Sequence, residues 1–146
     1  MSAFPKVFKV ESRGESGVQS TWINQLKDKP STPITMAIPP EFEGPGGTYS
    51  PEDLYALSLL NCYLATFKFV AEKSKLSYKQ IAGEATLYVD KGEEKAPWME
   101  RILLSITLSG CTDKTRSLNM LEKTKAHCMI LNSVKTKTDF EFSVHD

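Results

Sequence analysis

The chain has 146 residues, a length that suits a single domain, residues 1–146, with a sizeable hydrophobic core. Its 18 basic residues balance its 18 acidic residues, so charge gives no reason to expect a nucleic acid or an anionic membrane as a partner. No signal segment or membrane-spanning run is recognisable, so we expect a cytoplasmic protein with no membrane partner.

The first third of the chain predicts three strands. Residues 4–11 and 17–23 are rich in β-branched and aromatic residues, and a glycine-containing segment with Arg13 separates them. We therefore expect a hairpin with Arg13 in its loop. Residues 32–38 predict a third strand bounded by prolines, and residues 41–49 predict a loop.

A long helix is predicted to begin directly after this glycine-rich loop. Ser50 is a good N-cap, Pro51 suits the first helical position, and Glu52 lies where the helix dipole favours negative charge. Apolar residues fill residues 54–71 and leave almost no polar stripe, which is typical of a helix buried nearly all round. Because polar residues interrupt the run and a polar tail ends it near Lys75, we expect a core helix rather than a membrane span.

Two further strands are predicted to pair. Apolar and polar residues alternate over residues 84–89 and again over residues 101–108. The short segment Asp90–Pro97 predicts a loop, so the two strands form an antiparallel pair with one wet face.

The rest of the chain predicts a second helix and a last strand. Thr112 or Asp113 can cap a helix that runs towards Ala126, and residues 139–144 alternate as in a half-buried strand. The element order is therefore βββ-α-ββ-α-β. Strands grouped in this way favour an α+β fold with helices packed on antiparallel sheets.

Two segments resemble motifs of a known family. GPGGTYSPEDLYALSLLNCYLATF, residues 44–67, resembles the helix motif of the OsmC/Ohr family of thiol peroxidases, and AHCMILNSV, residues 126–134, resembles its second cysteine motif. The resemblance implies an OsmC-like α+β fold over essentially the whole chain, with antiparallel sheets around a long central helix in an intertwined homodimer. It also implies that Cys62 attacks an organic hydroperoxide and that Cys128 resolves the oxidised product.

A peroxide-reducing cysteine must be a thiolate, and a position in the middle of an apolar helix does not favour one at Cys62. A cation is therefore needed. We favour Arg13 over Arg101 and Arg116, which stand at a strand start and in the first turn of a helix, where solvated surface residues are common. Glu52 lies about 15 Å from Cys62 along one helix, so it either orients the arginine of a site, including one in the partner subunit, or only complements the helix dipole.

The apolar neighbours of Cys62 are candidates for a substrate pocket. Leu59, Tyr63 and Phe67 would shape a space for an alkyl chain, although such residues on an apolar helix are core residues by default. A pocket of this kind would favour organic hydroperoxides over hydrogen peroxide.

The sequence leaves three functions open. The first is a peroxidase for organic or fatty-acid hydroperoxides that works through a Cys62 sulfenic acid and a Cys62–Cys128 disulfide. A lipoyl-type dithiol or a small thiol would recycle it, with no metal and no bound cofactor. The second is an OsmC-like protein that binds an apolar ligand without turnover. The third, a thiol hydrolase, is disfavoured because adjacent residues such as His127 and Cys128 do not face each other on a helix. We expect Cys111 to take no part.

Overall fold

The chain consists of two compact units, Met1–Leu54 and Tyr55–Asp146. The computed structural model describes residues 3–93 and 96–146. Residues 94 and 95, which belong to the loop predicted at Asp90–Pro97, lie outside the described residues. Each unit contains its own three-stranded sheet, and the α+β fold predicted from the sequence is confirmed.

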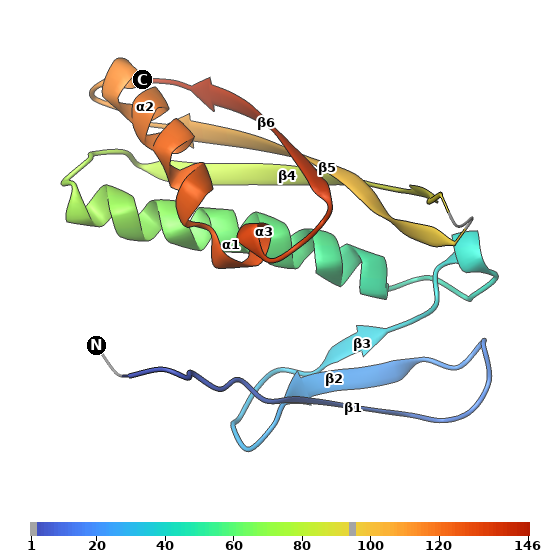
Figure 1. The fold of residues 1–146 in the computed structure, drawn as a ribbon. Coiled ribbons are helices and arrows are strands. Elements are labelled where there is room, and N and C mark those ends of the chain that lie inside the picture. Colours follow the sequence, from blue (N-terminus) through green and yellow to red (C-terminus); the bar gives the residue numbers. More distant parts are fainter. Residues whose placement is uncertain (1–2, 94–95) are drawn as a thin grey trace. The chain divides into compact units, whose positions relative to one another are not determined.

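The N-terminal unit contains an antiparallel sheet of three short strands (Figure 1). The strands are β1 (Val10–Gly14), β2 (Trp22–Leu26) and β3 (Ile34–Met36). The predicted hairpin is confirmed, but both of its strands begin later than the sequence predicted. Gly17 has a φ of 108°, and its carbonyl accepts the backbone N–H of Ser20 at 3.2 Å, which places the turn after residue 14. The prediction that Arg13 lies in the hairpin loop is therefore wrong, because Arg13 pairs with Ile23 inside the sheet.

A capped helix follows the loop after β3. One turn of 3-10 helix, η1 (Pro40–Phe42), interrupts that loop, and α1 then covers Pro51–Lys73. The Ser50 hydroxyl accepts the Asp53 backbone N–H at 3.1 Å, and the Asp53 carboxylate accepts the Ser50 N–H at 2.9 Å. This reciprocal pair satisfies two N–H groups at the helix start, so the predicted N-cap is confirmed.

The C-terminal unit contains a mixed sheet in the order β4-β5-β6. Its strands are β4 (Gln80–Lys91), β5 (Pro97–Ser109) and β6 (Lys137–Val144). The predicted antiparallel pairing of β4 with β5 is confirmed. However, β6 runs parallel to β5, which differs from the wholly antiparallel sheet expected from the sequence.

A helical crossover makes the parallel pairing possible, because parallel neighbours cannot be joined by a tight turn. The crossover consists of α2 (Lys114–Thr124), the 3-10 turn η2 (Lys125–His127) and the short helix α3 (Met129–Asn132). Figure 1 shows α1 along one face of this sheet, with α2 and α3 next to it. The crossover therefore carries the Cys128 segment past α1.

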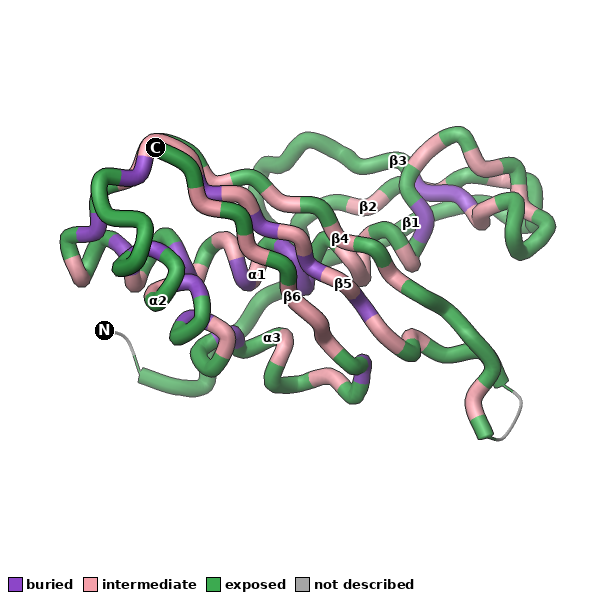
Figure 2. The backbone as a smooth tube through the Cα atoms, turned by 90° about the horizontal axis from the view of Figure 1, so that it is seen from above, coloured by how far each residue is buried: buried purple, intermediate pink, exposed green. Residues whose placement is uncertain are grey.

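The core of this unit lies between α1 and the sheet. Alternate residues of β5 are buried, as the colours of Figure 2 show along this strand. The buried residues are Ile102, Leu104, Ile106 and Leu108 on β5, and Leu59, Leu60, Tyr63, Phe67 and Ala71 on α1. A Cβ atom at Gly83 would lie 2.8 Å from the Leu60 side chain, so glycine at this position lets α1 approach β4 closely. Among the described residues α1 is long and apolar enough to cross a membrane, yet its buried side chains belong to this core.

Candidate redox site

The structure brings the two cysteine segments together in the C-terminal unit. Cys62 is half-buried on α1, and its Sγ accepts the backbone N–H of Ile130 at 3.4 Å. Ile130 follows Cys128 by two residues, and Cys128 is the N-cap of α3. The hydrogen bond thus ties Cys62 to the chain directly after Cys128.

Cys128 has a different environment from Cys62. Its side chain is fully buried, and its thiol donates to the carbonyl oxygen of Thr124 at 3.3 Å. Burial raises the pKa of Cys128 to about 11, a hydrogen bond with the Thr66 side chain lowers it, and the negative charge of a Cys62 thiolate raises it. The two sulfur groups are therefore within electrostatic reach of each other, and Cys128 is a neutral thiol at pH 7.

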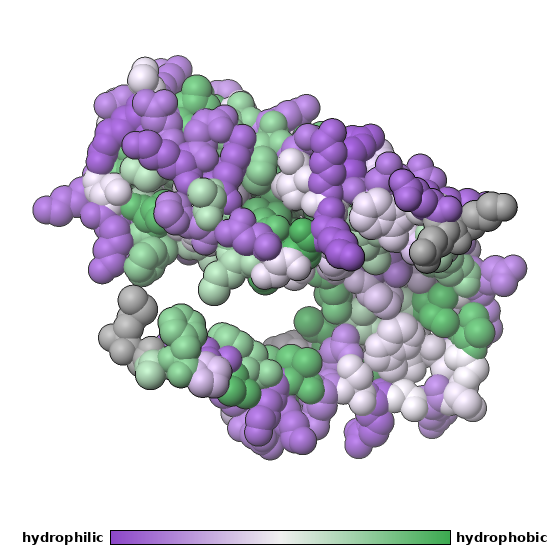
Figure 3. Space-filling view, viewed as in Figure 1, coloured by the Kyte–Doolittle hydropathy of each residue, from purple (hydrophilic) through white to green (hydrophobic). Residues whose placement is uncertain are grey.

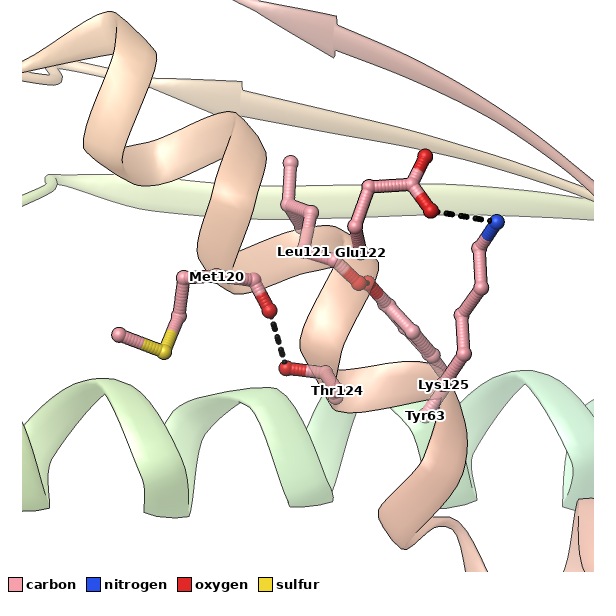
Figure 4. Close-up of polar contacts among 6 residues, drawn as sticks. All are labelled: Tyr63, Met120, Leu121, Glu122, Thr124 and Lys125. Atoms are coloured by element: carbon pink, nitrogen blue, oxygen red, sulfur yellow. Dashed lines mark hydrogen bonds and ion pairs between the residues drawn. The ribbon is translucent and has the colours of Figure 1, made fainter.

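Tyr63 anchors the end of α2 next to Cys128 (Figure 4). Its hydroxyl donates to the carbonyl oxygen of Leu121 at 2.7 Å. Burial raises the pKa of Tyr63 far above its ordinary value, and Cys128 and Glu122 add to the rise, so the phenol keeps its proton. Lys125, in the turn that follows α2, pairs with Glu122 at 2.8 Å. These contacts fix the turn of chain that leads into Cys128.

The three predicted pocket residues are core residues in the structure. Leu59, Tyr63 and Phe67 are all fully buried. The Tyr63 ring lies 5.3 Å from the Phe140 ring, and the Phe67 ring lies 5.5 Å from the Tyr78 ring. They pack the helix against its own unit, and their role in holding an alkyl chain stays a prediction.

Arg13 and Glu52 belong to the N-terminal unit, whereas both cysteines of the pair belong to the C-terminal unit. Arg13 is exposed and lines a hollow of about 240 Å³ together with Glu11 and Gln25. One carboxylate oxygen of Glu52, Oε1, is buried and has no hydrogen-bond partner among the described residues. The predicted roles of Arg13 and Glu52 at Cys62 stay predictions.

Cys111 and His127 have surroundings that differ from those of the cysteine pair. Cys111 is buried, and its backbone N–H donates to the carbonyl of His145 at 3.0 Å. It precedes α2, whereas Cys128 follows it, so the 11 residues of that helix separate the two cysteines. His127 is exposed while Cys128 is fully buried. Within residues 3–93 and 96–146 no group of three histidine, cysteine or acidic side chains is placed to hold a metal ion.

Two residues of the site, Thr66 and Ile130, were not predicted from the sequence. Thr66 follows Cys62 by four residues, a spacing that places both on one face of a helix, and this signal would have found it. Ile130 acts through its backbone N–H, so its side chain carries no signal of this role.

Comparisons with known proteins agree with this arrangement. The family described as OsmC-like protein matches residues 44–143. An uncharacterized protein of Acinetobacter baylyi is 27% identical over 114 residues, which cover 76% of each chain.

Two solved structures share the fold. An OsmC-like protein of unknown function from Vibrio cholerae superposes with a TM-score of 0.81 at 15% identity, covering 94% of this chain and 99% of that chain. An organic hydroperoxide resistance protein OsmC from Legionella pneumophila superposes with a TM-score of 0.74 at 19% identity, covering 97% of this chain and all of that chain (100%).

Proposed function

Because this chain belongs to the OsmC-like protein family, we propose that it is a thiol-dependent peroxidase that reduces organic or fatty-acid hydroperoxides. The observation that carries the proposal is the contact between Cys62 Sγ and the N–H of Ile130 at 3.4 Å. It holds one thiol beside the segment that carries the other. The name of the Legionella protein, an organic hydroperoxide resistance protein, supports the choice of substrate class.

The proposed chemistry has two steps in the protein. The Cys62 thiolate attacks the O–O bond and takes one oxygen, so that Cys62 becomes a sulfenic acid and the hydroperoxide, with one proton, leaves as an alcohol. The Cys128 sulfur then displaces the hydroxyl group of the sulfenic acid. The Cys62–Cys128 disulfide forms, and the hydroxyl group leaves with the Cys128 proton as water. A lipoyl-type dithiol or a small thiol returns both cysteines to the reduced state.

The different burial of the two thiols supports this assignment. Cys62 is half-buried, so a peroxide oxygen can reach it, whereas Cys128 is fully buried. With its pKa raised to about 11, Cys128 is protonated and does not compete for the peroxide. Cys62 therefore takes the attacking role and Cys128 the resolving role.

Groups outside the pair complete the proposal. Arg13 would supply the cation that stabilises the Cys62 thiolate, and Glu52 would orient that arginine. In a homodimer either residue can come from the partner subunit. Alkyl groups of the substrate would lie on the apolar side chains around Cys62. A cytoplasmic location suits the cycle, because that compartment supplies reduced thiols.

The proposal is tested by peptide mapping after one equivalent of cumene hydroperoxide. We expect a Cys62–Cys128 disulfide and a free Cys111. Cys128→Ser should accumulate sulfinic acid at Cys62 under excess peroxide, because no thiol resolves the sulfenic acid. Cys111→Ser is the matched control and should cycle normally.

Two results would contradict it. A Cys62–Cys111 link would assign the wrong resolving cysteine. No change at any cysteine would favour the alternative of a protein that binds an apolar ligand without turnover.

A further inference from the structure

Cys62 and Cys128 have hydrogen-bond partners of opposite kinds. The Cys62 Sγ accepts the backbone N–H of Ile130 at 3.4 Å, whereas the Cys128 Sγ donates its proton to the carbonyl oxygen of Thr124 at 3.3 Å. A peptide N–H only donates and a carbonyl only accepts. The Ile130 N–H is therefore suited to a thiolate at Cys62, and the Thr124 carbonyl is suited to a thiol at Cys128.

The turn of chain that carries the Ile130 N–H is held by hydrogen bonds of its own. The Asn132 backbone N–H donates to the Cys128 carbonyl at 2.9 Å, and the Ser133 backbone N–H donates to the Ile130 carbonyl at 3.0 Å. The Asn132 side chain also donates to the Ala126 carbonyl at 3.1 Å. Because α3 has only four residues, a helix dipole adds little, and the donor is a single peptide group whose position is held.

We propose that the backbone N–H of Ile130 is a further catalytic group, which stabilises the Cys62 thiolate and thereby selects Cys62 as the cysteine that attacks the hydroperoxide. The inference rests on the proposed function and concerns the state of the protein before its first step. The N–H keeps its hydrogen throughout, while the Cys62 proton passes to water. A hydrogen bond to a charged group is stronger than one between neutral groups, so this contact favours the thiolate over the thiol.

The titratable groups on α1 and on the crossover next to Cys62 have partners or surroundings of their own. On α1, Tyr55 lies two turns before Cys62 on the same face, and its hydroxyl forms a hydrogen bond with a threonine side chain. In the turn before Cys128, Lys125 is held in an ion pair and His127 is exposed. Burial raises the pKa of Cys128 to about 11, so this thiol stays uncharged at pH 7 and does not oppose ionisation of Cys62.

The test replaces Ile130 in two ways that remove its N–H. Ile130→Pro removes the hydrogen in the first turn of α3, where proline is tolerated. Incorporation of the α-hydroxy acid analogue of isoleucine at this position converts the amide to an ester and keeps the side chain, so this variant decides the question if proline disturbs the fold.

Met129→Pro is the matched control. Met129 is the first residue of α3, and the N–H of a first helical residue has no partner in its own helix. Cys128 before it has extended backbone angles, φ −86° and ψ 103°, as a residue before proline prefers. This substitution therefore introduces the same ring into the same turn and leaves the Ile130 N–H in place.

The readout is alkylation of each cysteine by iodoacetamide across pH, followed by peptide mapping, because iodoacetamide reacts with the thiolate and needs no peroxidase activity. In both Ile130 variants we expect the pH profile of Cys62 to move to higher pH, since its thiolate loses a donor, and alkylation at pH 7 to fall about tenfold. The difference should vanish at high pH, where Cys62 is ionised in every variant. Consumption of cumene hydroperoxide at pH 7 should fall by a similar factor, and Met129→Pro should match the parent protein.

If peroxide leaves Cys62 unchanged while its alkylation profile still depends on the Ile130 N–H, the proposed function fails and stabilisation of the thiolate stands. An unchanged Cys62 profile in the ester variant would overturn the inference. Equal displacement of the profile in Met129→Pro would also overturn it, because the shape of the turn would then matter rather than the N–H. A rate lowered by the same factor at every pH would do so too, since it would report access to Cys62 rather than its ionisation. Peroxide consumption at the parent rate in a variant with a displaced profile would overturn the catalytic role.

Discussion

The arginines of the chain differ in how their side chains are held. The Arg101 guanidinium lies 3.8 Å from the centre of the Tyr88 ring, an arrangement that stabilises a cation on an aromatic face. Arg116 donates to the Ser74 carbonyl, which ties α2 to the end of α1. Arg13 instead lies on an exposed strand. Two of the three arginines therefore have structural roles of their own.

Replacement of these residues tests which one supports Cys62. We expect Arg13→Ala to slow peroxide consumption by roughly ten- to hundredfold, because a charge-assisted hydrogen bond to the thiolate is lost. Arg101→Ala and Arg116→Ala serve as controls and should change the rate little. The measurement is the initial rate of organic hydroperoxide loss under excess dithiol. An Arg13→Ala rate equal to that of the parent protein would remove Arg13 from the site.

At the scale of residues, the sequence identified the two cysteines but not their surroundings in the folded chain. The motif around Cys62 and the segment after Cys128 are local patterns, so both could be identified without a structure. The full burial of Cys128 could not, since it depends on the packing of the crossover against α1. The hydrogen bond from Ile130 could not be predicted either, because any residue type other than proline would supply the same N–H.

At the scale of elements, the position of Cys128 depends on how α2 begins and ends. The Asp113 carboxylate accepts the Arg116 backbone N–H at 3.0 Å and caps the first turn. At the other end, the Tyr63 hydroxyl holds the Leu121 carbonyl. The sequence left Thr112 and Asp113 as equal candidates for the cap, because both residue types suit that position, and the structure decides for Asp113.

Loss of this cap should weaken the crossover. We expect Asp113→Ala to lower the free energy of unfolding by about 1 kcal/mol, since the Arg116 N–H loses its acceptor. Thr112→Ala is the matched control and should change stability by less than about 0.5 kcal/mol. Urea denaturation followed by circular dichroism gives both values. Equal losses in the two variants would show that the carboxylate does not cap the helix.

Element boundaries also show what limits prediction from sequence. The alternating patterns of β4 and β5 specified their pairing, because adjacent strands with a short loop pair antiparallel. The direction of β6 was not specified by its own pattern, since alternation is the same in parallel and antiparallel strands. The first hairpin shifted because Arg13 and Gly14, which were predicted between its strands, belong to β1, and the turn lies around Gly17.

At the scale of the whole molecule, the N-terminal unit exposes many large apolar side chains. Figure 3 shows hydrophobic residues on the surface of this unit. Phe8 is 87% exposed and Val10 is 73% exposed, whereas Met36 and Ala37 are its buried apolar residues. A unit with so small a core needs cover from elsewhere. The exposed Phe69 on α1, at 62%, adds to the apolar surface of the chain.

We expect a second copy of the chain to provide this cover, so that the protein is a homodimer. Light scattering at micromolar concentration should give twice the mass of one chain. Phe8→Ser should shift the mass towards that of one chain, because it removes exposed apolar surface, and the neighbouring substitution Lys9→Ser should leave it unchanged. A folded single chain at this concentration, with an unchanged circular dichroism spectrum, would contradict the prediction.

The parallel pairing of β5 and β6 affects the order in which the redox site forms during translation. The ribosome makes β6 after α1, β4, β5 and the Cys128 segment. Until β6 docks, the edge of β5 is open and Tyr63 lacks its aromatic neighbours Phe140 and Phe142. Cys62 and Cys128 are thus synthesised before the packing that gives them different burial is complete. Cys62 and Cys128 therefore do not reach their final surroundings until the C-terminal strand has joined the sheet.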